Sequence, residues 1–268
     1  MRGVEHYENF PVAPPWLPRA EREALIAVYA FARQADDFSD EPQYEGRRLA
    51  LLKEWQALLD RRPATPEFAA LADACERFQI PKTLLKDLCR AFMLDCRRRS
   101  HKDFRSLADY CRYSAAPVGR IVLRIFKMDS PEAVLESDAI CTGLQLANFW
   151  QDLGEDYRIR RRVYLPSEDM KRFGVRSGDL GAASASPALK KLLAFEVGRA
   201  EAHFKAGEGL VERLGGTLKW QIRLTLLGGR RILQKIRDQD YDTLSKRPRL
   251  GMPDLPWFAA KLLLGRLS

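Results

Sequence analysis

The sequence predicts an all-α fold. Strand patterns are sparse, whereas long segments carry apolar residues at three- and four-residue spacing, as at Leu189, Leu192, Leu193 and Val197. That spacing gathers apolar side chains on one face of a helix. Hydrophobic residues make up 46% of the 268 residues, enough for a sizeable core. Because neither a repeat nor a low-complexity linker divides the chain, we expect one domain over residues 1–268.

Prolines, glycines and capping residues mark the ends of the helices. Residues 1–18 alternate prolines with aromatic residues, which indicates an ordered arm. The first helix should run from Arg19 to Asp40 and end before Pro42. Thr65 is placed to cap a later helix and Pro66 to occupy its first turn. The further helices are expected at 46–59, 65–78, 81–96, 105–127, 188–214 and 217–238. A long helix should begin near Pro131 or Leu135 and end near Tyr157.

Three segments interrupt or follow these helices. Pro117 and Gly119 should kink the helix at 105–127, and their small size serves either close packing or a substrate-lining role. Residues 173–187 are rich in Gly, Ser and Ala and indicate a surface connection. The apolar tail at 256–265 either packs on its own domain or touches a membrane.

Two acidic segments carry the strongest chemical signal. Asp36 and Asp40 are one helical turn apart, and Asp152 and Asp156 repeat that step far downstream. Like charges at this spacing repel, so each pair predicts a counter-ion. If the helices face each other, the four carboxylates converge. Hard oxygen ligands of this kind suit Mg²⁺, which commonly bridges carboxylates to substrate phosphates.

The same spacing also arises by chance in a chain with 36 acidic residues. Asp238 and Asp242 match it too, among basic residues, and we interpret that pair as a solvated helix face. The first two pairs differ because they lie inside mostly apolar helical segments, where an uncompensated charge is costly to bury. Asp95 likewise interrupts an apolar helical pattern. Gln145 and Asn148 share nearly the same helical face as the second pair.

Four arginines follow the second acidic segment: Arg158, Arg160, Arg161 and Arg162. They either form structural ion pairs or grip an anion, since guanidinium groups match phosphate oxygens well. A basic run at 97–99 indicates a solvated helix end or a phosphate contact.

The net charge of +9 suits nucleic acid, an anionic membrane or phosphorylated substrates. Neither a groove-reading helix motif nor a nucleotide-binding fingerprint is present, so we expect no nucleic-acid partner. Without a long apolar run or a signal-peptide core, a cytoplasmic protein is expected, with peripheral contact at the inner face of the membrane as a further expectation. Five cysteines, an odd number, argue against a complete disulfide framework, and three histidines argue against a His-based zinc site.

Carboxylates, Mg²⁺, arginines and an apolar helical cavity suit the ionisation of an isoprenoid diphosphate. Metal ions and arginines neutralise the departing pyrophosphate, and aromatic faces stabilise the carbocation by about 0.5–2 kcal/mol each. The aromatic candidates are Phe10, Tyr29, Tyr110, Tyr113, Phe149 and Tyr164.

Three blocks, at 29–40, 110–119 and 145–156, together resemble the squalene/phytoene synthase family. The resemblance implies an all-α isoprenoid-synthase fold around a central apolar cavity and Mg²⁺-dependent head-to-head prenyl chemistry. It also implies roles for individual residues. Those matching the family's metal ligands are Asp36, Asp40, Asp152 and Asp156, and those matching its substrate-binding residues are Tyr29, Arg33, Tyr110, Gln145, Asn148 and Tyr164.

Two positions depart from the family pattern: Gln151 stands where arginine is common, and no tyrosine lies near Gly229. Both argue against full two-step squalene synthesis. The opening at residues 6–12 and the run at 246–250 resemble the bacterial hydroxysqualene synthases of hopanoid pathways. That branch implies presqualene diphosphate as the substrate and hydroxysqualene as the product. The alternatives are condensation of two farnesyl diphosphates and, in another class, a non-catalytic helical lipid-binding or assembly scaffold.

Overall fold

Helices form nearly all of the regular structure in residues 12–61, 65–97 and 100–263, which are the residues that the structure, a computed structural model, describes. In chain order they are α1 (Arg19–Asp40), α2 (Arg48–Arg61), α3 (Pro66–Arg77), α4 (Lys82–Asp95), α5 (Phe104–Ser114), α6 (Ala116–Ile125), α7 (Pro131–Glu155), α8 (Ser167–Arg172), α9 (Pro187–Gly207), α10 (Gly209–Arg213), α11 (Gly216–Asp238) and α12 (Leu255–Leu263). Short 3-10 turns are η1 (Pro42–Tyr44), η3 (Ser177–Gly181) and η4 (Met252–Asp254), and η2 (Asp156–Arg160) is a π turn. The all-α prediction is confirmed, and α1 has both of its predicted ends.

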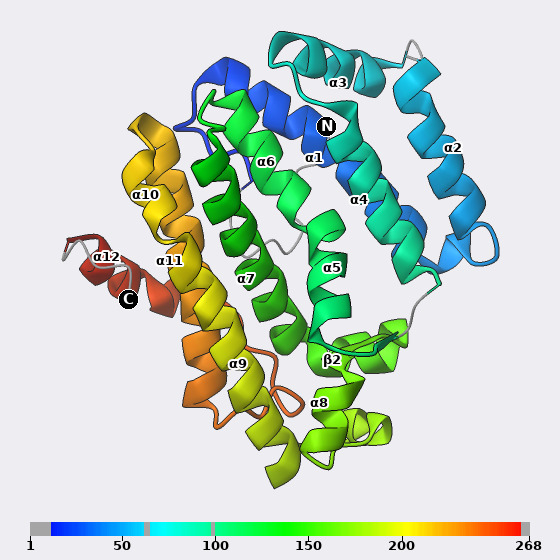
Figure 1. The fold of residues 1–268 in the computed structure, drawn as a ribbon, viewed down its shortest axis with the longest axis vertical. Helices are drawn as coiled ribbons and strands as arrows, with labels where there is room; N and C mark the ends of the chain where they lie inside the picture. The colour runs from blue at the N-terminus through cyan, green and yellow to red at the C-terminus, as the bar shows by residue number, and fades with distance from the viewer. Residues whose placement is uncertain (1–11, 62–64, 98–99, 264–268) are drawn as a thin grey trace.

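Helix α7 lies at the centre, between α6 and α9 (Figure 1). The Ser130 side chain caps it by accepting a 3.2 Å hydrogen bond from the Ala133 amide, and Pro131 occupies its first turn. The helix also contacts α5 and α11, so apolar residues point to several sides of it. Because α7 carries the second acidic segment, this packing fixes where that segment lies.

Two apolar clusters make up the core, and α6 belongs to both. Ile121 and Ile125 pack with the first cluster, built mainly on α1 to α4, while Leu123 packs with the second, built on α5 to α11. Alternating side chains of one short helix therefore join the two halves. The result is an all-helical single-domain fold.

The expected kink is a complete break at Ala115, which separates α5 from α6. Pro117 lies in the first turn of α6, where a missing amide proton costs nothing. A Cβ on Gly119 would collide with Ser137 and come within 2.6 Å of the Cys141 sulfur, both on α7. Of the two roles expected for this segment, Gly119 therefore serves close helix packing.

Three local expectations need correction. Thr65 occupies the N-cap position, but its side chain makes no capping hydrogen bond. The connection at 173–187 is not purely a surface segment, because it contains η3 with buried Leu180. The single helix expected at 188–214 is interrupted at Glu208, which separates α9 from α10.

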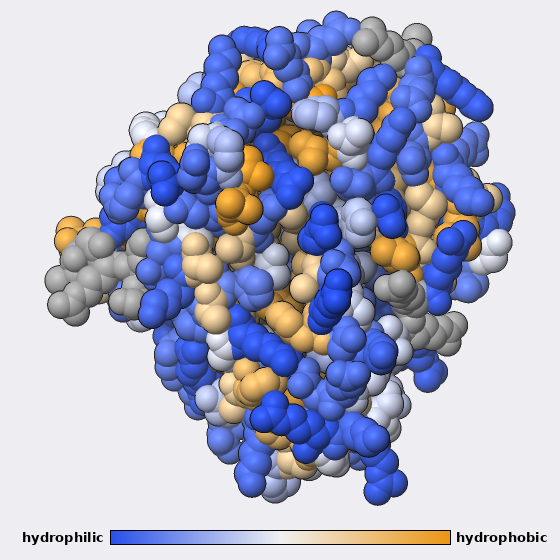
Figure 2. Space-filling view, in the orientation of Figure 1, coloured by the Kyte–Doolittle hydropathy of each residue, from blue (hydrophilic) through white to orange (hydrophobic). Residues whose placement is uncertain are grey.

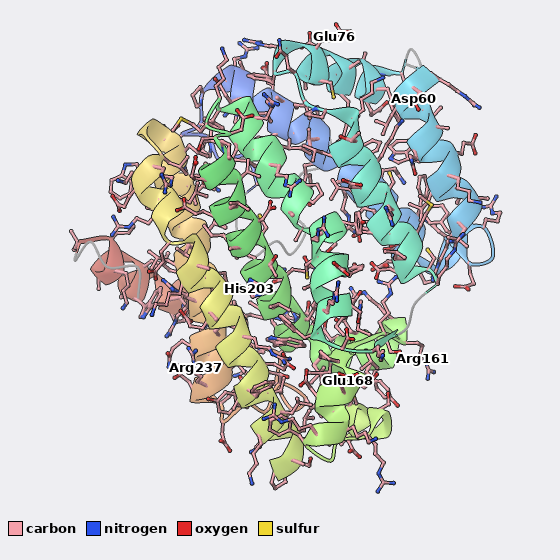
Figure 3. All side chains as sticks on the ribbon, viewed as in Figure 1. Asp60, Glu76, Arg161, Glu168, His203 and Arg237 are labelled. Atoms are coloured by element: carbon pink, nitrogen blue, oxygen red, sulfur yellow. The ribbon has the colours of Figure 1, made fainter. Side chains whose placement is uncertain are left out.

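Only one strand pair occurs in the described parts of the chain: β1 (Ser100–His101) runs parallel to β2 (Val163–Pro166). This pair places β2, the first element after the arginine-rich segment, against the end of α4 and the start of α5. Charged side chains such as Asp60, Glu76 and Arg161 lie at the periphery (Figure 3), and apolar residues on the face in Figure 2 form separate small patches. Within the described ranges, no helix is long and apolar enough to cross a membrane.

Candidate active site

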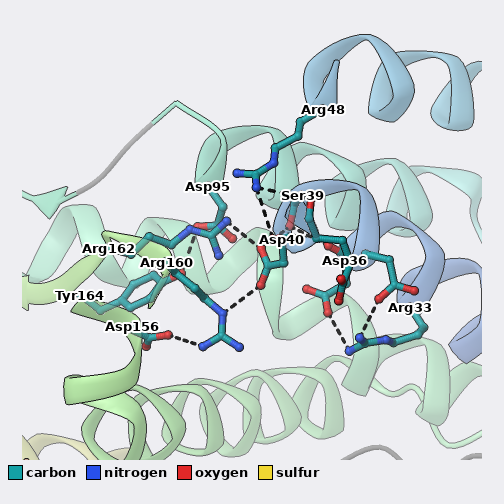
Figure 4. Close-up of polar contacts among 12 residues, drawn as sticks. Arg33, Asp36, Ser39, Asp40, Arg48, Asp95, Asp156, Arg160, Arg162 and Tyr164 are labelled. Atoms are coloured by element: carbon teal, nitrogen blue, oxygen red, sulfur yellow. Dashed lines mark hydrogen bonds and ion pairs between the residues drawn. The ribbon is translucent and has the colours of Figure 1, made fainter. Parts of the chain in front are cut away.

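One guanidinium joins the two acidic segments. Arg160 places its Nε 3.1 Å from Asp40 Oδ2, at the end of α1, and its Nη1 2.9 Å from Asp156 Oδ1, after α7 (Figure 4). A second arginine, Arg162, contacts Asp40 Oδ1 at 2.8 Å. The chain therefore brings carboxylates from both segments to the same place.

The turn after α7 positions Arg160 and Arg162 beside the end of α1. Helix α7 widens into the π turn η2, and Arg161 then adopts a left-handed conformation with φ of 57°. The Arg162 amide donates a 3.0 Å hydrogen bond to the Asp156 carbonyl, which closes the turn. The chain reverses here, so Arg160 and Arg162 point back toward α1 while Arg161 stays exposed. π turns are rare and frequently occur at functional sites.

The aspartates have unequal pKa values. Burial raises the pKa of Asp36 to about 7, and neighbouring Asp40 adds to the rise. Burial likewise raises the pKa of Asp156 to about 7, although Arg160 opposes it. Burial acts on Asp40 too, but Arg162, Ser39 and Arg160 together hold its pKa below the usual range. The raised pKa values of Asp36 and Asp156 therefore come first from burial, with a neighbouring aspartate adding to each and an arginine opposing it.

The first segment holds its own arginine. Arg33 Nη1 lies 3.0 Å from Asp36 Oδ2, and its Nη2 lies 2.6 Å from Asp37 Oδ1. Tyr29 is one helical turn before Arg33 on α1, and its charge interaction with Arg33 places it at this end of the site. Tyr29, Arg33 and Asp36 therefore interact along α1, next to Asp40.

A C-terminal segment that sequence reasoning missed covers the second acidic segment. Arg247 forms an ion pair with Asp152 and lies 3.8 Å from Glu155, while Gln151 donates a 2.6 Å hydrogen bond to the Pro248 carbonyl. In the sequence, residues 246–250 indicate only a resemblance to hydroxysqualene synthases. Their alternation of basic residues and proline was the available signal for an anion-facing loop.

One side of α7 is open where the predicted polar residues lie. Asn148 is exposed although its neighbours Ala147, Phe149 and Trp150 are buried. Gln145 and Asp152 lie on the same side and are partly exposed. An exposed polar stripe on a central helix leaves room for a ligand beside the aspartates. The enclosed central apolar cavity stays a prediction.

An aromatic cluster borders the acidic residues. Tyr164 stacks on Phe149 with ring centres 3.8 Å apart, and Tyr110 lies 5.9 Å from Tyr164. Tyr110 and Tyr164 donate hydrogen bonds of 2.6 and 3.2 Å to the two oxygens of Asp95. Asp95, which interrupts an apolar helical pattern in the sequence, thus has two tyrosine hydroxyls as partners.

Other candidates lie apart from this cluster. The Tyr113 ring lies under Arg90, 4.1 Å from its guanidinium carbon, and Phe10 is outside the described residues. Arg158 packs its guanidinium against Gly154. Asp242 accepts hydrogen bonds from the amides of Ala185 and Ser245, so the third acidic pair has a structural role instead of being purely solvated.

The donor set fits Mg²⁺. Each acidic pair offers hard oxygen ligands one turn apart, and Mg²⁺ typically takes one or two carboxylates together with water and substrate phosphates. Within the described part of the chain, no three acidic, histidine or cysteine side chains are grouped to hold one ion. Arginines pair with these carboxylates instead: Arg33 with Asp36, Arg160 with Asp156 and Arg247 with Asp152. All five cysteines are free thiols.

Comparison with known proteins gives one family. A family model described as squalene/phytoene synthase matches residues 4–254. A hydroxysqualene synthase from Rhodopseudomonas palustris is 39% identical over 69% of this chain, and the match spans 64% of that relative's length. A hydroxysqualene synthase from Sinorhizobium fredii is 32% identical over 89% of this chain and 82% of the relative. The crystal structure of squalene synthase HpnC from Alicyclobacillus acidocaldarius superposes with a TM-score of 0.81 at 38% identity, covering 88% of this chain and 90% of that one.

Proposed function

The chain belongs to the squalene/phytoene synthase family, and we propose that it converts presqualene diphosphate and water into hydroxysqualene and pyrophosphate with Mg²⁺. The observation that carries the proposal is the bridge of Arg160 between Asp40 and Asp156, because it gathers acidic groups of both segments around one point. Its similarity to hydroxysqualene synthases, 39% and 32% identical in the two relatives described above, supports the choice of product.

In this proposal Asp36, Asp40, Asp152 and Asp156 would hold Mg²⁺, and the bound ion would supply positive charge against the leaving pyrophosphate. Arg33, Arg160, Arg162 and Arg247 bind the phosphate oxygens once they release the carboxylates. Gln145 and Asn148, on the open side of α7, orient the diphosphate. The carbon–oxygen bond of the substrate breaks, and the electron pair leaves with the pyrophosphate.

The aromatic cluster suits the carbocation that remains. Phe149, Tyr110 and Tyr164 are each 5–7% exposed, so they offer ring faces and exclude bulk water. The cyclopropylcarbinyl cation rearranges there, and one water molecule then forms the carbon–oxygen bond of the alcohol.

The two departures from the family pattern support the single-step reaction. Gln151 is buried and bound to the Pro248 carbonyl, so it offers no charge to a second diphosphate. The Phe204 ring fills the space beside Gly229, where a Cβ would meet it at 2.5 Å, and it also packs against Gly143. A tyrosine at residue 229 would displace this ring.

Incubation of the purified protein with presqualene diphosphate and Mg²⁺, without NADPH, tests the proposal. Hydroxysqualene and pyrophosphate in equal amounts are expected. A parallel incubation uses farnesyl diphosphate, and its turnover to presqualene diphosphate would favour the condensation reaction instead. Lack of turnover with either substrate would favour the non-catalytic scaffold.

The proposal includes peripheral contact with a membrane. No residue of α12 is buried, and Met252, Leu255 and Leu263 are 77%, 54% and 88% exposed. Arg231 and Lys261 lie over the Trp257 ring, so positive charge borders this apolar face. Flotation with anionic liposomes should be weaker at high salt and weaker for Leu255→Glu than for Leu135→Glu, an exposed leucine on α7.

A further inference from the structure

Asp95 accepts hydrogen bonds from the hydroxyl groups of two tyrosines, one on each carboxylate oxygen. Tyr110 comes from α5 and Tyr164 from β2, and both rings are buried. Burial and Asp95 raise the pKa values of both phenols well above the ordinary range, so both keep their protons. The carboxylate, by contrast, can only accept.

This arrangement decides what each phenol can offer to a third group. A phenol has a single proton, and here that proton points at Asp95. Each tyrosine oxygen is therefore left as an acceptor. A water molecule bound to either oxygen must donate to it, and the lone pairs of that water then point away from the tyrosine.

The neighbours of Asp95 connect these acceptor oxygens to the acidic cluster. The Arg162 guanidinium, which binds Asp40, lies beside Asp95 (Figure 4), so the acceptor oxygens border the acidic cluster. Phe149 stacks on Tyr164 and covers it from the side of α7. A carbocation left after loss of pyrophosphate would meet aromatic faces and a water with its lone pairs exposed.

We propose, on the basis of the proposed function, that Asp95 is a positioning residue that turns Tyr110 and Tyr164 into acceptors for the capturing water and receives its proton through Tyr110. The water oxygen forms a bond to the cationic carbon and gives one proton to the Tyr110 oxygen. The original Tyr110 proton moves to Asp95 Oδ2. The cation, water and carboxylate thus become an alcohol and a carboxylic acid, which later loses its proton to solvent.

The acid strength of Asp95 suits this role. Burial raises the pKa of Asp95 to about 6, with Arg162 and the two tyrosines opposing the rise and Asp40 adding to it. At neutral pH the group is mostly ionised, and it can take up one proton without a large penalty. Tyr110 is the relay because its hydrogen bond to Asp95, at 2.6 Å, is shorter than the 3.2 Å bond from Tyr164.

Asp95→Asn tests the inference, because an asparagine accepts on one atom and donates from the other. With presqualene diphosphate and Mg²⁺, pyrophosphate release should stay within about threefold of wild type, while the hydroxysqualene share of the products falls about tenfold or more. Tyr110→Phe should shift the products in the same way, and Tyr164→Phe should shift them less. Asp60→Asn, at the exposed end of α2, is the matched control and should change neither quantity.

The outcomes separate the inference from the function it rests on. If wild type makes hydroxysqualene and Asp95→Asn keeps the same product shares, the inference is wrong and the function stands. If Asp95→Asn loses pyrophosphate release and hydroxysqualene in parallel, Asp95 acts in ionisation and the inference is again wrong. If wild type makes no hydroxysqualene, both the proposed function and the inference are wrong. Should Asp95→Asn not fold by circular dichroism, the product shares of Tyr110→Phe decide.

Discussion

Arg162 donates a 2.8 Å hydrogen bond to Asp40, and this bond ties the end of α1 to the start of β2. The two residues are 122 positions apart in the chain, and each also belongs to a local group. Asp40 shares Arg160 with Asp156, and Arg162 lies beside Asp95. The ion pair is thus the place where the acidic cluster meets the aromatic one.

The energetic coupling of this pair can be measured. Arg162 is 9% exposed at its side chain, so Arg162→Gln and Asp40→Asn should each lower the free energy of unfolding by about 1–3 kcal/mol. The double variant should lose less free energy of unfolding than the two single variants lose together, by at least about 0.5 kcal/mol. This is because both changes remove the same contact. Urea unfolding gives all three values.

An exposed pair is the control. Arg19 and Glu23 also form an ion pair at 2.7 Å, but both are largely exposed, and removal of either should cost under about 1 kcal/mol. Strict additivity of the Asp40 and Arg162 changes would show that the two side chains do not interact in solution.

Glu196 predicts a pH dependence of stability. It lies fully buried on α9, with Oε1 3.0 Å from Arg199, and Asp169 adds a second negative charge nearby. Burial raises its pKa from 4.5 to about 7 against the pull of Arg199. The folded protein therefore binds this proton more tightly than the unfolded chain, and the contribution present below pH 4.5 is lost as the pH rises through 7.

Glu196→Gln keeps the shape and removes the charge, so the variant should become more stable relative to wild type as the pH rises across that window. Urea unfolding at pH 4.5, 6 and 8 tests this, with Glu54→Gln, an exposed residue of α2, as the control. A constant difference between Glu196→Gln and wild type at all three pH values would contradict the prediction.

Gly119 and Gly198 form a matched pair for helix packing. Gly119→Ala should lower the free energy of unfolding by about 1–3 kcal/mol, because its Cβ would press on Ser137 and Cys141 of α7. Gly198→Ala meets no atom within 4 Å on an exposed face of α9 and should stabilise by up to about 1 kcal/mol. Thermal unfolding compares them, and equal effects of the two changes would refute the packing argument.

Local signals in the sequence located most of the helices, although they did not predict α8 or the break between α9 and α10. Pro18 and Pro42 bracket α1, whose ends were predicted without error, and Ser130 with Pro131 begins α7. These features act through backbone sterics and capping within a few residues. The spacing of the aspartates likewise follows from helix geometry alone.

Contacts between distant segments were not predictable in the same way. That Arg160 and Arg162, not Arg158 or Arg161, turn toward α1 depends on the π turn at η2 and the left-handed Arg161. The pairing of Arg247 with Asp152 depends on how the loop after α11 crosses α7. Such choices are made by tertiary packing, which no local periodicity records.

The central claim is that both acidic segments act on one pyrophosphate, and Mg²⁺-dependent pyrophosphate release from presqualene diphosphate tests it most directly. Asp40→Asn and Asp152→Asn should each slow release by about 100-fold or more while circular dichroism stays helical. The double variant should be little slower than either, because groups that act as a unit are not additive. The control is Asp238→Asn, in the third acidic pair, which should release pyrophosphate at the wild-type rate. Near-normal release by either Asp40→Asn or Asp152→Asn would contradict the account.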